Sequence, residues 1–522
     1  MRKQFIRNRK VRYGGMTVLL TVLLIAATVL ANVLFGTLAR RYGWYVSMNA
    51  GTNYGVTGKC YQLLETMLNA AEERNGERRK VEIIFCDLPE NLEKSDTGSF
   101  IYHTACSLAE RFPNDISVTC YDIWLNPANV REYLTSVVLD PETGLETEQK
   151  VTLKSTSVIL TCGSYHRVYS NTEFYVFEGG NLSNVWAYNG EKKLTAGILH
   201  ALRPDSPVVC LTNNHGEAYY DYELIYLLDD AGYRIDYVDL SKDPIPAACN
   251  LLICYNPNKD LTVSDHLSDL SEPDLLNDFL SVPGNIFLAF IEDGTPELPN
   301  LEAFLAGWGV SACYHTTSAG VRYRYMVQDT SGSLTSDGYT IYGKPSDASG
   351  LLEGLSPNVV FKNATALRAA QGFIPVPGGT GGVYENGDHS RTLYALWEGG
   401  NGAVSWANGA PVDGDRVMLA TLTEQKLTGG SSYVGVFASA DFATESFLQS
   451  AVYGNTDALL RLLGKLGSAD TPEGLTVKPF RQVQMSLVTT AEKFRWTVVL
   501  AATPAVVILT AAVIILVRRK HS

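Results

Sequence analysis

The sequence lacks the short motifs that mark ATP hydrolysis and structural zinc sites. It contains no G-x-x-x-x-G-K-[ST] P-loop, so the chain is not expected to hydrolyse ATP itself. It contains no C-x-x-C pair among its nine cysteines, which argues against a structural zinc site and a thioredoxin-type redox centre. It also lacks a basic excess, since the formal net charge is −13, and this disfavours nucleic-acid binding. We expect no cofactor.

Long uncharged runs occur only at the two ends of the chain. Residues 16–38 and 496–517 contain no charged side chain, and each run exceeds the ~20 residues needed to cross a bilayer. The mean hydropathy of the whole chain is −0.01, which excludes a polytopic transporter. The sequence therefore predicts one transmembrane helix at each end.

Basic residues flank both runs on the side of the chain ends. Residues 1–15 carry six basic side chains and no acidic one, and residues 518–522 carry three basic side chains. Short basic tails stay cytoplasmic, so we expect a two-pass protein of the cell membrane with both termini cytoplasmic and residues 39–495 outside. This exterior segment holds 33 basic and 55 acidic residues, a net charge of −22. A cleaved signal peptide is the alternative for the N-terminus, although its apolar core would be only ~7–15 residues long.

The exterior segment has the patterns of two α/β domains. Residues 44–203 alternate helical and β-rich runs, which predicts a small α/β domain with a largely parallel sheet. Residues 204–467 repeat the alternation, and the run at 250–255 is apolar without alternation, as in a strand covered on both faces. This second domain is predicted to contain a doubly wound sheet.

Gly, Ser, Thr and Tyr become frequent in residues 311–430, where short β-rich runs alternate with glycine clusters. We interpret this segment as a β-rich insertion in the second domain. Residues 468–495 contain two prolines and form the predicted linker back to the second apolar run.

The cysteines favour a structural role. Their odd number excludes complete intramolecular pairing. Cys86, Cys210 and Cys254 lie in or at the end of short apolar runs, where free cysteine acts as a small hydrophobic side chain. We expect these three to be buried thiols.

Several motifs, in a fixed order, carry a family resemblance. They are TGKCYQLL at 57–64, NNHGE at 213–217, AGYRIDYVDLSKDPIPAACNLLICYNPNKDLT at 231–262, and FASADFATESFL at 437–448 with Gly-Asn at 454–455. Together with the two apolar ends, they resemble the GldG-like family of ABC-transporter auxiliary proteins. The resemblance implies a glutamine-amidotransferase-like α/β domain without the amidotransferase catalytic residues. It also implies association with an ABC permease and its ATPase.

Candidate ligand contacts cluster in the NNHGE turn. His215 and Glu217 follow a predicted strand and open a helix, the position where open α/β sheets bind ligands. His and Glu together could exchange protons or hold a metal. The alternative is a structural turn in which His215 orders the loop and Glu217 favours the positive end of the next helix. Asn214 and Asp441, the latter just past another strand, complete the candidate set.

Two further groups carry weaker signals. Cys162 follows a strand with His166 nearby, but Leu160 stands where a nucleophile elbow has a small residue, so a structural role is favoured. Glu292 and Asp293 follow a strand, and two adjacent acids without a third ligand are weak evidence for a metal site.

These observations lead to one function hypothesis and two alternatives. The chain is expected to be a non-catalytic, membrane-anchored auxiliary subunit of an ABC-2-type transport system, whose exterior domains bind a substrate or partner. One alternative is an exterior hydrolase or amidase that uses His215, Glu217 or Cys162. The other is a stand-alone cell-surface scaffold or sensor.

Overall fold

The computed structural model describes most of the chain between residues 55 and 480, together with residue 495. The gaps in this description are residues 140–145, 178–183, 204–205, 218–221, 264–270, 293, 330–332, 347–348, 356–357, 378–380, 401–402, 408–409, 413–416 and 468–469. By compactness the chain divides into Met1–Asn53 and Tyr54–Ser522, and the second unit holds all described residues. The division into domains at residue 204 stays a prediction.

No helix in the described part of the chain is long and apolar enough to cross a membrane. The longest described helix, α2 (Gly58–Asn75), has charged side chains such as Glu65 and Glu72 on its exposed side and buries only one face. This finding corrects the predicted architecture of two terminal transmembrane helices and the two-pass membrane localisation that followed from it. The segments on which the prediction rested, 16–38 and 496–517, lie outside the described residues, as do both predicted tails.

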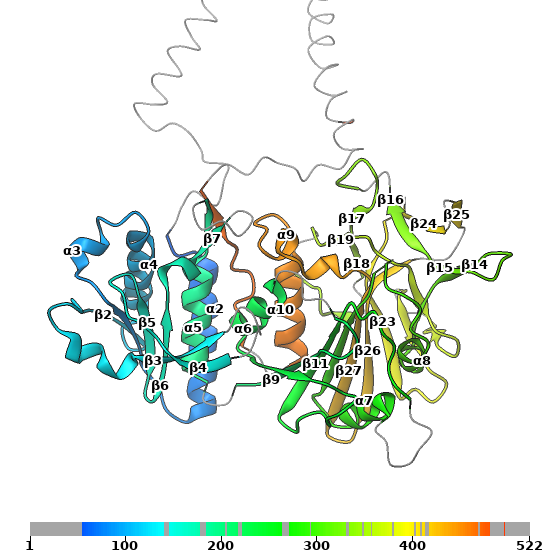
Figure 1. The fold of residues 1–522 in the computed structure, drawn as a ribbon, viewed down its shortest axis with the longest axis horizontal. Coiled ribbons are helices and arrows are strands. Elements are labelled where there is room, and N and C mark those ends of the chain that lie inside the picture. Colours follow the sequence, from blue (N-terminus) through cyan, green and yellow to red (C-terminus); the bar gives the residue numbers. More distant parts are fainter. Residues whose placement is uncertain are drawn as a thin grey trace, which may run out of the picture. The chain divides into compact units, whose positions relative to one another are not determined.

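The N-terminal segment, residues 55–203, contains a four-stranded sheet of order β2-β1-β5-β6. Three of these strands, β2, β5 and β6, are labelled in Figure 1. Strands β1 and β2 are parallel, whereas β1 pairs with β5, and β5 with β6, in antiparallel fashion. The predicted largely parallel sheet is therefore wrong for this segment. The elements are α2, β1 (Val81–Phe85), α3 (Pro89–Leu92), α4 (Gly98–Arg111), β2 (Ile116–Cys120), the 3₁₀ helix η2 (Pro127–Tyr133), β3 (Thr135–Leu139), β4 (Glu146–Lys150), β5 (Val158–Cys162), β6 (Tyr165–Tyr169), η3 (Asn171–Phe174), β7 (Tyr175–Phe177), β8 (Val185–Tyr188) and α5 (Gly190–Ala201).

Local signals explain the limits of α2. The Thr57 hydroxyl accepts a hydrogen bond from the amide of Cys60 at the N-terminus, and Gly76 takes a left-handed conformation at the C-terminus. Cys60, Leu64 and Leu68 recur at helical spacing and are buried in one core with residues of α4, α5 and one face of the sheet. This apolar spacing determines which face of α2 is buried.

The C-terminal segment, residues 206–480, is built on a 12-stranded sheet. Five strands of the sheet are parallel, in the order β10-β9-β11-β12-β27. The parallel strands and the helices that accompany them are β9 (Val208–Thr212), α6 (Glu223–Asp230), β10 (Arg234–Val238), β11 (Cys249–Tyr255), α7 (Glu272–Leu280), β12 (Ile286–Phe290), α8 (Pro299–Gly307), β27 (Gly430–Phe437), α9 (Glu445–Leu448) and α10 (Asn455–Leu466).

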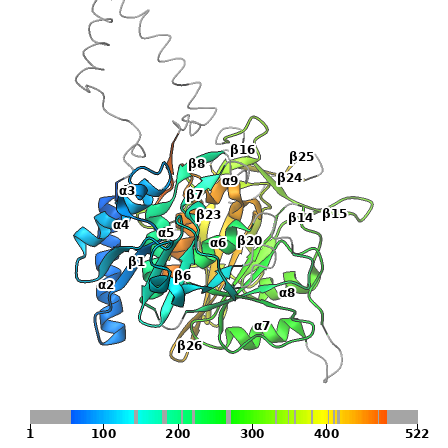
Figure 2. The same cartoon turned by 60° about the vertical axis from the view of Figure 1, so that its left-hand side comes forward.

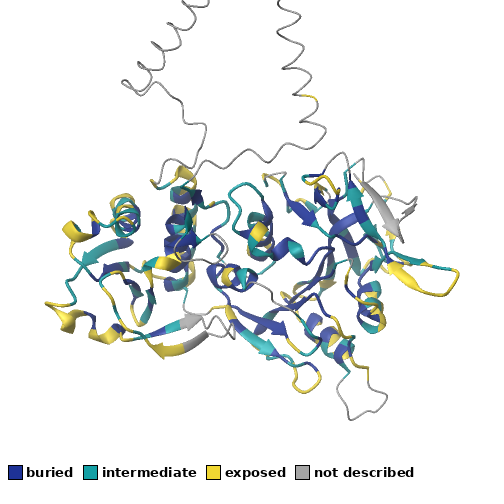
Figure 3. Cartoon of the chain, turned by 45° about the horizontal axis from the view of Figure 1, so that its top comes forward, coloured by how far each residue is buried: buried dark blue, intermediate teal, exposed yellow. Residues whose placement is uncertain are grey.

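The parallel strands are covered on both faces. Alternate side chains, such as Leu251 and Ile253 of β11, share a core with α6 and α10. The intervening side chains, such as Leu252 and Cys254, share a core with α7 and α8, which lie together on one side of these strands in Figure 2. Strand β11 is buried almost along its whole length, and Figure 3 shows that dark blue, buried ribbon is concentrated in the interior of the described part of the chain. The predicted doubly wound sheet is confirmed for this part of the chain.

The β-rich segment predicted over 311–430 extends the main sheet. Beyond β27 the sheet continues with antiparallel strands in the order β26-β23-β22-β21. The remaining strands of this region form short ribbons or pair at its margins, and β28 pairs with β8 of the N-terminal segment. These elements are β13 (Val310–Ala312), β14 (Tyr314–Thr316), β15 (Arg322–Arg324), β16 (Met326–Asp329), β17 (Thr340–Tyr342), β18 (Lys344–Pro345), β19 (Val360–Lys362), β20 (Leu367–Ala369), β21 (Ile374–Pro375), β22 (Val383–Glu385), β23 (Arg391–Glu398), β24 (Ala403–Ala407), β25 (Ala410–Val412), β26 (Met418–Leu427), η6 (Asp441–Ala443) and β28 (Lys478–Pro479).

All nine cysteines are free thiols. Cys86, Cys210 and Cys254 are buried, at 2% exposure or less, as predicted for small core side chains.

Candidate functional site

The predicted NNHGE turn lies at the carboxyl edge of the parallel strands. Strand β9 ends at Thr212, and the turn follows directly, so that His215 and Glu217 sit beside the end of β11. Helix α7 begins nearby at Glu272, a residue that the sequence analysis did not select. The structure therefore places the predicted residues at the edge where open α/β sheets bind ligands.

His215 lies between two carboxylates. Its Nδ1 is 3.0 Å from Oε1 of Glu217, and its Nε2 is 3.0 Å from Oε2 of Glu272. The side-chain amide of Asn214 donates to Oε1 of Glu272 over 2.7 Å. The side chains of His215, Glu217 and Glu272 are almost completely buried. We call His215, Glu217 and Glu272 the histidine triad.

The histidine triad also fixes the backbone of the turn. The amide of His215 donates to Oε2 of Glu217 over 2.8 Å, and its carbonyl accepts hydrogen bonds from the amides of Asn258 and Lys259, each 2.9 Å long. The hydroxyl of Thr212 donates to Glu217 as well. All of these contacts join parts of the turn and its neighbouring loop, as the structural interpretation of the turn predicts.

Electrostatics favour a charged triad. Burial opposes the charge of His215, but the hydrogen bonds that its ring donates to Glu217 and Glu272 outweigh this effect and raise the pKa of the imidazole to about 9. Burial likewise opposes the charges of Glu217 and Glu272, yet the hydrogen bonds from His215 lower the pKa of both carboxyl groups. A buried imidazolium between two carboxylates is a structural ion cluster whose donors are already engaged.

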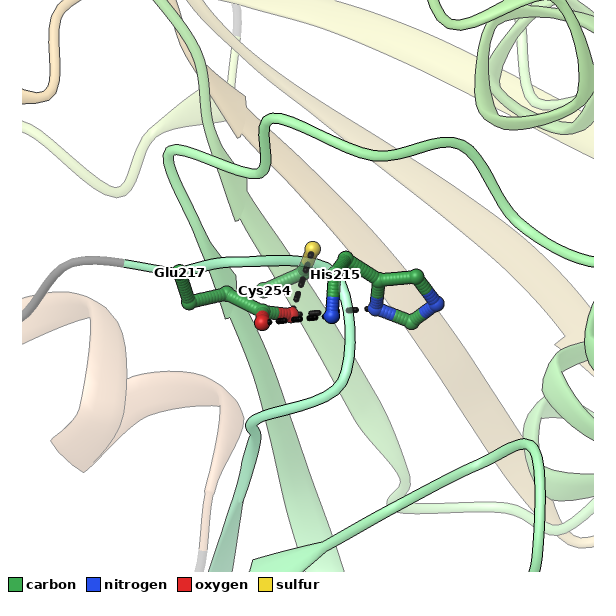
Figure 4. A group of neighbouring side chains, drawn as sticks. All are labelled: His215, Glu217 and Cys254. Carbon is green, nitrogen blue, oxygen red and sulfur yellow. Dashed lines mark hydrogen bonds and ion pairs between the residues drawn. The ribbon is translucent and has the colours of Figure 1, made fainter.

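The same place has one feature of a metal site. The donor atoms of His215, Glu217 and Cys254 lie within 4.8 Å of one another, and Figure 4 shows the three side chains together. However, the Glu217 carboxylate is engaged by both His215 and Thr212, and Cys254 Sγ lies 3.9 Å from Glu217 Oε1. Burial and the charge of Glu217 also raise the pKa of the Cys254 thiol, which opposes the thiolate that metals bind. The arrangement fits a structural cluster better than a metal centre.

Gly216 provides a direct test of how tightly this turn is built. It adopts φ +71°, and a Cβ atom at this position would lie 2.2 Å from Oδ1 of Asn258. We expect Gly216→Ala to reduce the free energy of unfolding by about 2–3 kcal/mol, from backbone strain and displacement of Asn258. Urea denaturation measures this effect.

Gly76→Ala is the matched control for Gly216→Ala. Gly76 has almost the same φ, +72°, but a Cβ there would meet nothing within 4 Å. The Gly76→Ala substitution should lower the free energy of unfolding only through backbone strain, by about 1 kcal/mol. Equal losses for the two variants would show that the contact with Asn258 contributes nothing.

The structure does not bring Asp441 to the histidine triad. Asp441 follows β27, three strands away from β9 along the same edge of the sheet, or roughly 14 Å at the usual strand spacing. Its Oδ2 accepts from Asn363 over 2.8 Å and lies 3.3 Å from the ammonium of Lys362. Asp441 therefore fixes a loop at this edge.

The weaker candidates also have structural partners. Glu292 accepts a hydrogen bond from Asn256 over 2.8 Å, and Asp293 lies outside the described residues. His166 Nε2 is 2.7 Å from the carbonyl oxygen of Thr135, and burial raises the pKa of the Cys162 thiol. Cys162 and His166 flank a hairpin, and no hydrogen bond joins them among the residues that the structure describes.

A second polar cluster, which sequence reasoning missed, joins the N-terminal and C-terminal segments. Arg167 of β6 donates two hydrogen bonds, of 2.7 and 2.9 Å, to the carboxylate of Asp229 of α6. Lys193 of α5 donates to Asp230 over 2.7 Å, and the ammonium of Lys192 lies 3.8 Å from Asp230. All five residues are buried, so we call them the buried ion network.

The buried ion network has a signal in the sequence. Lys192 and Lys193 lie near the N-terminus of α5, and Asp229 and Asp230 are the last two residues of α6. Each pair opposes the dipole of its own helix, an arrangement that is unfavourable unless the charges have partners elsewhere. Two such unfavourable pairs of opposite sign predict a contact between the two helix ends.

A cavity of about 520 Å³ opens beside this network. Its walls come from both segments: Arg167, Glu173 and Lys193 belong to the N-terminal segment, and Glu223 and Tyr226 to α6. Its volume falls in the range typical of small-molecule sites, which often occur between domains. None of the residues selected from the sequence lines it.

Comparisons with known proteins add little to this description. No family model and no curated protein matches the chain. Among solved structures, a chain described as "Structure of PurLQS from Thermotoga maritima" is similar with a TM-score of 0.25 and 12% identity, over 50% of this chain and 99% of that chain. A similarity this slight assigns neither fold nor function.

Proposed function

We propose that the chain is a non-catalytic, ligand-binding auxiliary subunit that acts with the permease and ATPase of an ABC-2-type transport system. The observation that carries the binding role is the cavity of about 520 Å³ between the two α/β segments. The transport context comes from the GldG-like motifs, and the missing P-loop assigns ATP hydrolysis to a partner.

The contacts of the side chains at the carboxyl edge of the main sheet support a non-catalytic role. His215 and Glu217 are buried and engaged with each other, with Glu272 and with the backbone of the turn. A general acid or base must reach the proton that it transfers, and these side chains face other protein groups.

Purification of the full-length, affinity-tagged chain from its native host tests this proposal. After extraction in mild detergent, mass spectrometry should identify a permease and an ATPase with a P-loop among the enriched proteins. An unrelated tagged chain of similar net charge, carried through the same steps, is the control. Repeated preparations that lack both subunits would remove the transport role.

A further inference from the structure

The buried ion network contains one more cation than it has anions. Arg167 donates two hydrogen bonds to Asp229, and Lys193 donates one to Asp230, so each carboxylate already has a close basic partner. Lys192 is the third cation. The three basic and two acidic side chains give the network a formal net charge of +1.

Lys192 is the least engaged cation of the network. Its Nζ lies 3.8 Å from Oδ2 of Asp230, beyond hydrogen-bond distance, and no hydrogen bond to this ammonium occurs among the described residues. The Nζ of Lys193, by comparison, lies 2.7 Å from Asp230 and 3.6 Å from Asp229. An ammonium group has three N–H donors. Lys192 therefore keeps unused hydrogen-bonding capacity although the residue is only 8% exposed.

This ammonium belongs to the wall of the cavity, because Lys192 is one of the lining residues. A buried charge is unfavourable unless it is paired and hydrogen-bonded. A buried cation with spare donors beside an open volume therefore suits an anionic ligand group better than a neutral one. A single surplus charge matches a carboxylate, whereas a phosphate dianion would bring a second negative charge next to Asp230.

The other charged residues of the cavity leave one position for an acid group. All three cations that line the cavity belong to the buried ion network. Outside the network, the lining residues include three carboxylates, those of Glu173, Glu223 and Glu445, and no basic side chain. An acid group in the cavity is therefore expected at the end where Lys192 lies.

Helix α6 provides apolar surface next to this end. Tyr226, Leu227 and Asp230 line the cavity from one face of the helix. Tyr226 precedes Asp230 by about one turn, or about 6 Å of helix rise, and is 37% exposed. A ligand group that pairs with Lys192 thus places an apolar body of roughly one ring against Tyr226 and Leu227, where burial of apolar surface favours binding.

We propose that the cavity binds a small organic monocarboxylate with a short apolar body, whose carboxylate group pairs with the ammonium of Lys192. The body packs against Tyr226 and Leu227 of α6. This inference deepens the proposed binding role and rests on it only in taking the cavity as the ligand site.

Three probes with the same body and different end groups test the proposal. Isothermal titration of the full-length chain with 3-phenylpropanoate, 3-phenylpropanamide and 3-phenylpropylamine compares an anion, a neutral molecule and a cation. We expect the carboxylate to bind about tenfold more tightly than the amide, and the amine to bind most weakly. Equal or tighter binding of the amide or the amine, or no binding of the carboxylate at millimolar concentration, would overturn the proposal.

Substitutions then locate the carboxylate group of the ligand. Lys192→Met should weaken binding of 3-phenylpropanoate about tenfold and change binding of the amide by less than about twofold. Lys192→Arg keeps the charge and should retain the affinity for the carboxylate to within about threefold. Lys94→Met removes the same charge from an exposed residue outside the cavity and should change neither affinity.

Thermal unfolding shows whether Lys192→Met keeps the fold. Its melting temperature should stay within about 2 °C of the original, because Asp230 keeps its hydrogen bond from Lys193. An unchanged affinity for the carboxylate in this variant, with thermal unfolding preserved, contradicts the assigned position. The comparison of the three probes needs no variant, so it decides the charge preference even if a substitution prevents folding.

The two proposals can fail separately. Binding of the carboxylate by a chain that never co-purifies with a permease or an ATPase would keep the cavity site and remove the transport role. A chain that co-purifies with both but binds no carboxylate would keep the transport role and remove the anion site.

Discussion

An Asp229→Asn variant is expected to lose about 3–5 kcal/mol of unfolding free energy, measured by urea denaturation. The substitution keeps the shape of the side chain but removes the charge that faces the Arg167 guanidinium. Arg167 is only 6% exposed, so water cannot replace the lost partner. Leaving a buried charge uncompensated has an effect of this size.

Two further variants separate the ion pair from a general effect of substitution. Glu65→Gln breaks a pair between Glu65 and Arg111 whose side chains are 57% and 54% exposed, and it should change stability by less than about 1 kcal/mol. The double variant Arg167→Met with Asp229→Leu removes both charges and should recover most of the loss. A double variant as unstable as Asp229→Asn would mean that Arg167 is not the reason for the loss.

Stability is expected to fall by about 2 kcal/mol between pH 6 and pH 8.5 because of His215. The folded pKa of about 9 lies above the ordinary value of 6.5. A raised pKa stabilises the folded state fully below the unfolded pKa, and this contribution is lost as the pH rises toward 9. Urea denaturation at a series of pH values measures the decline. Above about pH 8.5 the buried cysteines add their own decline, so the effect of His215 is read below that pH.

His200 gives the opposite dependence and serves as the internal control. It lies half-buried in α5, where its Nε2 is shielded from water, and desolvation of the ring lowers the pKa of its imidazole to about 4. The unfolded chain then binds a proton that the folded chain does not, so stability falls as the pH drops from about 6.5 to 4. In His215→Gln, the fall in the free energy of unfolding toward alkaline pH should disappear, and the acid side should not change. In His200→Gln, only the loss of stability between about pH 6.5 and pH 4 that His200 causes should disappear. An alkaline decline that persists in His215→Gln would assign it to another group.

The main sheet could be predicted from the sequence because burial on both faces leaves a strong pattern. Strand β11 has no polar alternation, and the helices on either side have clear apolar faces. The sheet of the N-terminal segment is harder to predict from the sequence, because its antiparallel strand pairs depend on short turns. Strands β5 and β6 join through Gly163 and Ser164, with Gly163 at φ +62°. In the sequence these two residues follow Cys162 and so stand in the neighbourhood of a possible nucleophile. A Gly-Ser pair between two β-rich runs is instead the pattern of a hairpin with a two-residue turn.

The histidine triad could be predicted only in part. His215 and Glu217 lie two residues apart, so their proximity is visible in the sequence. Glu272 comes from the start of α7, 57 positions after His215, and only the crossover of the fold brings it to the imidazole. The cavity could not be predicted from the sequence, because its walls come from elements that are distant in the chain.

The position of β27 has a consequence for the order in which the main sheet is completed. This strand lies at the centre of the sheet, between parallel β12 and antiparallel β26, but it is the last strand of the sheet along the chain. During synthesis, β12 therefore has an unpaired edge until more than 130 further residues have been made. An edge of this kind invites incorrect pairing, so release of a chain shortened before residue 430 should favour aggregation over folding.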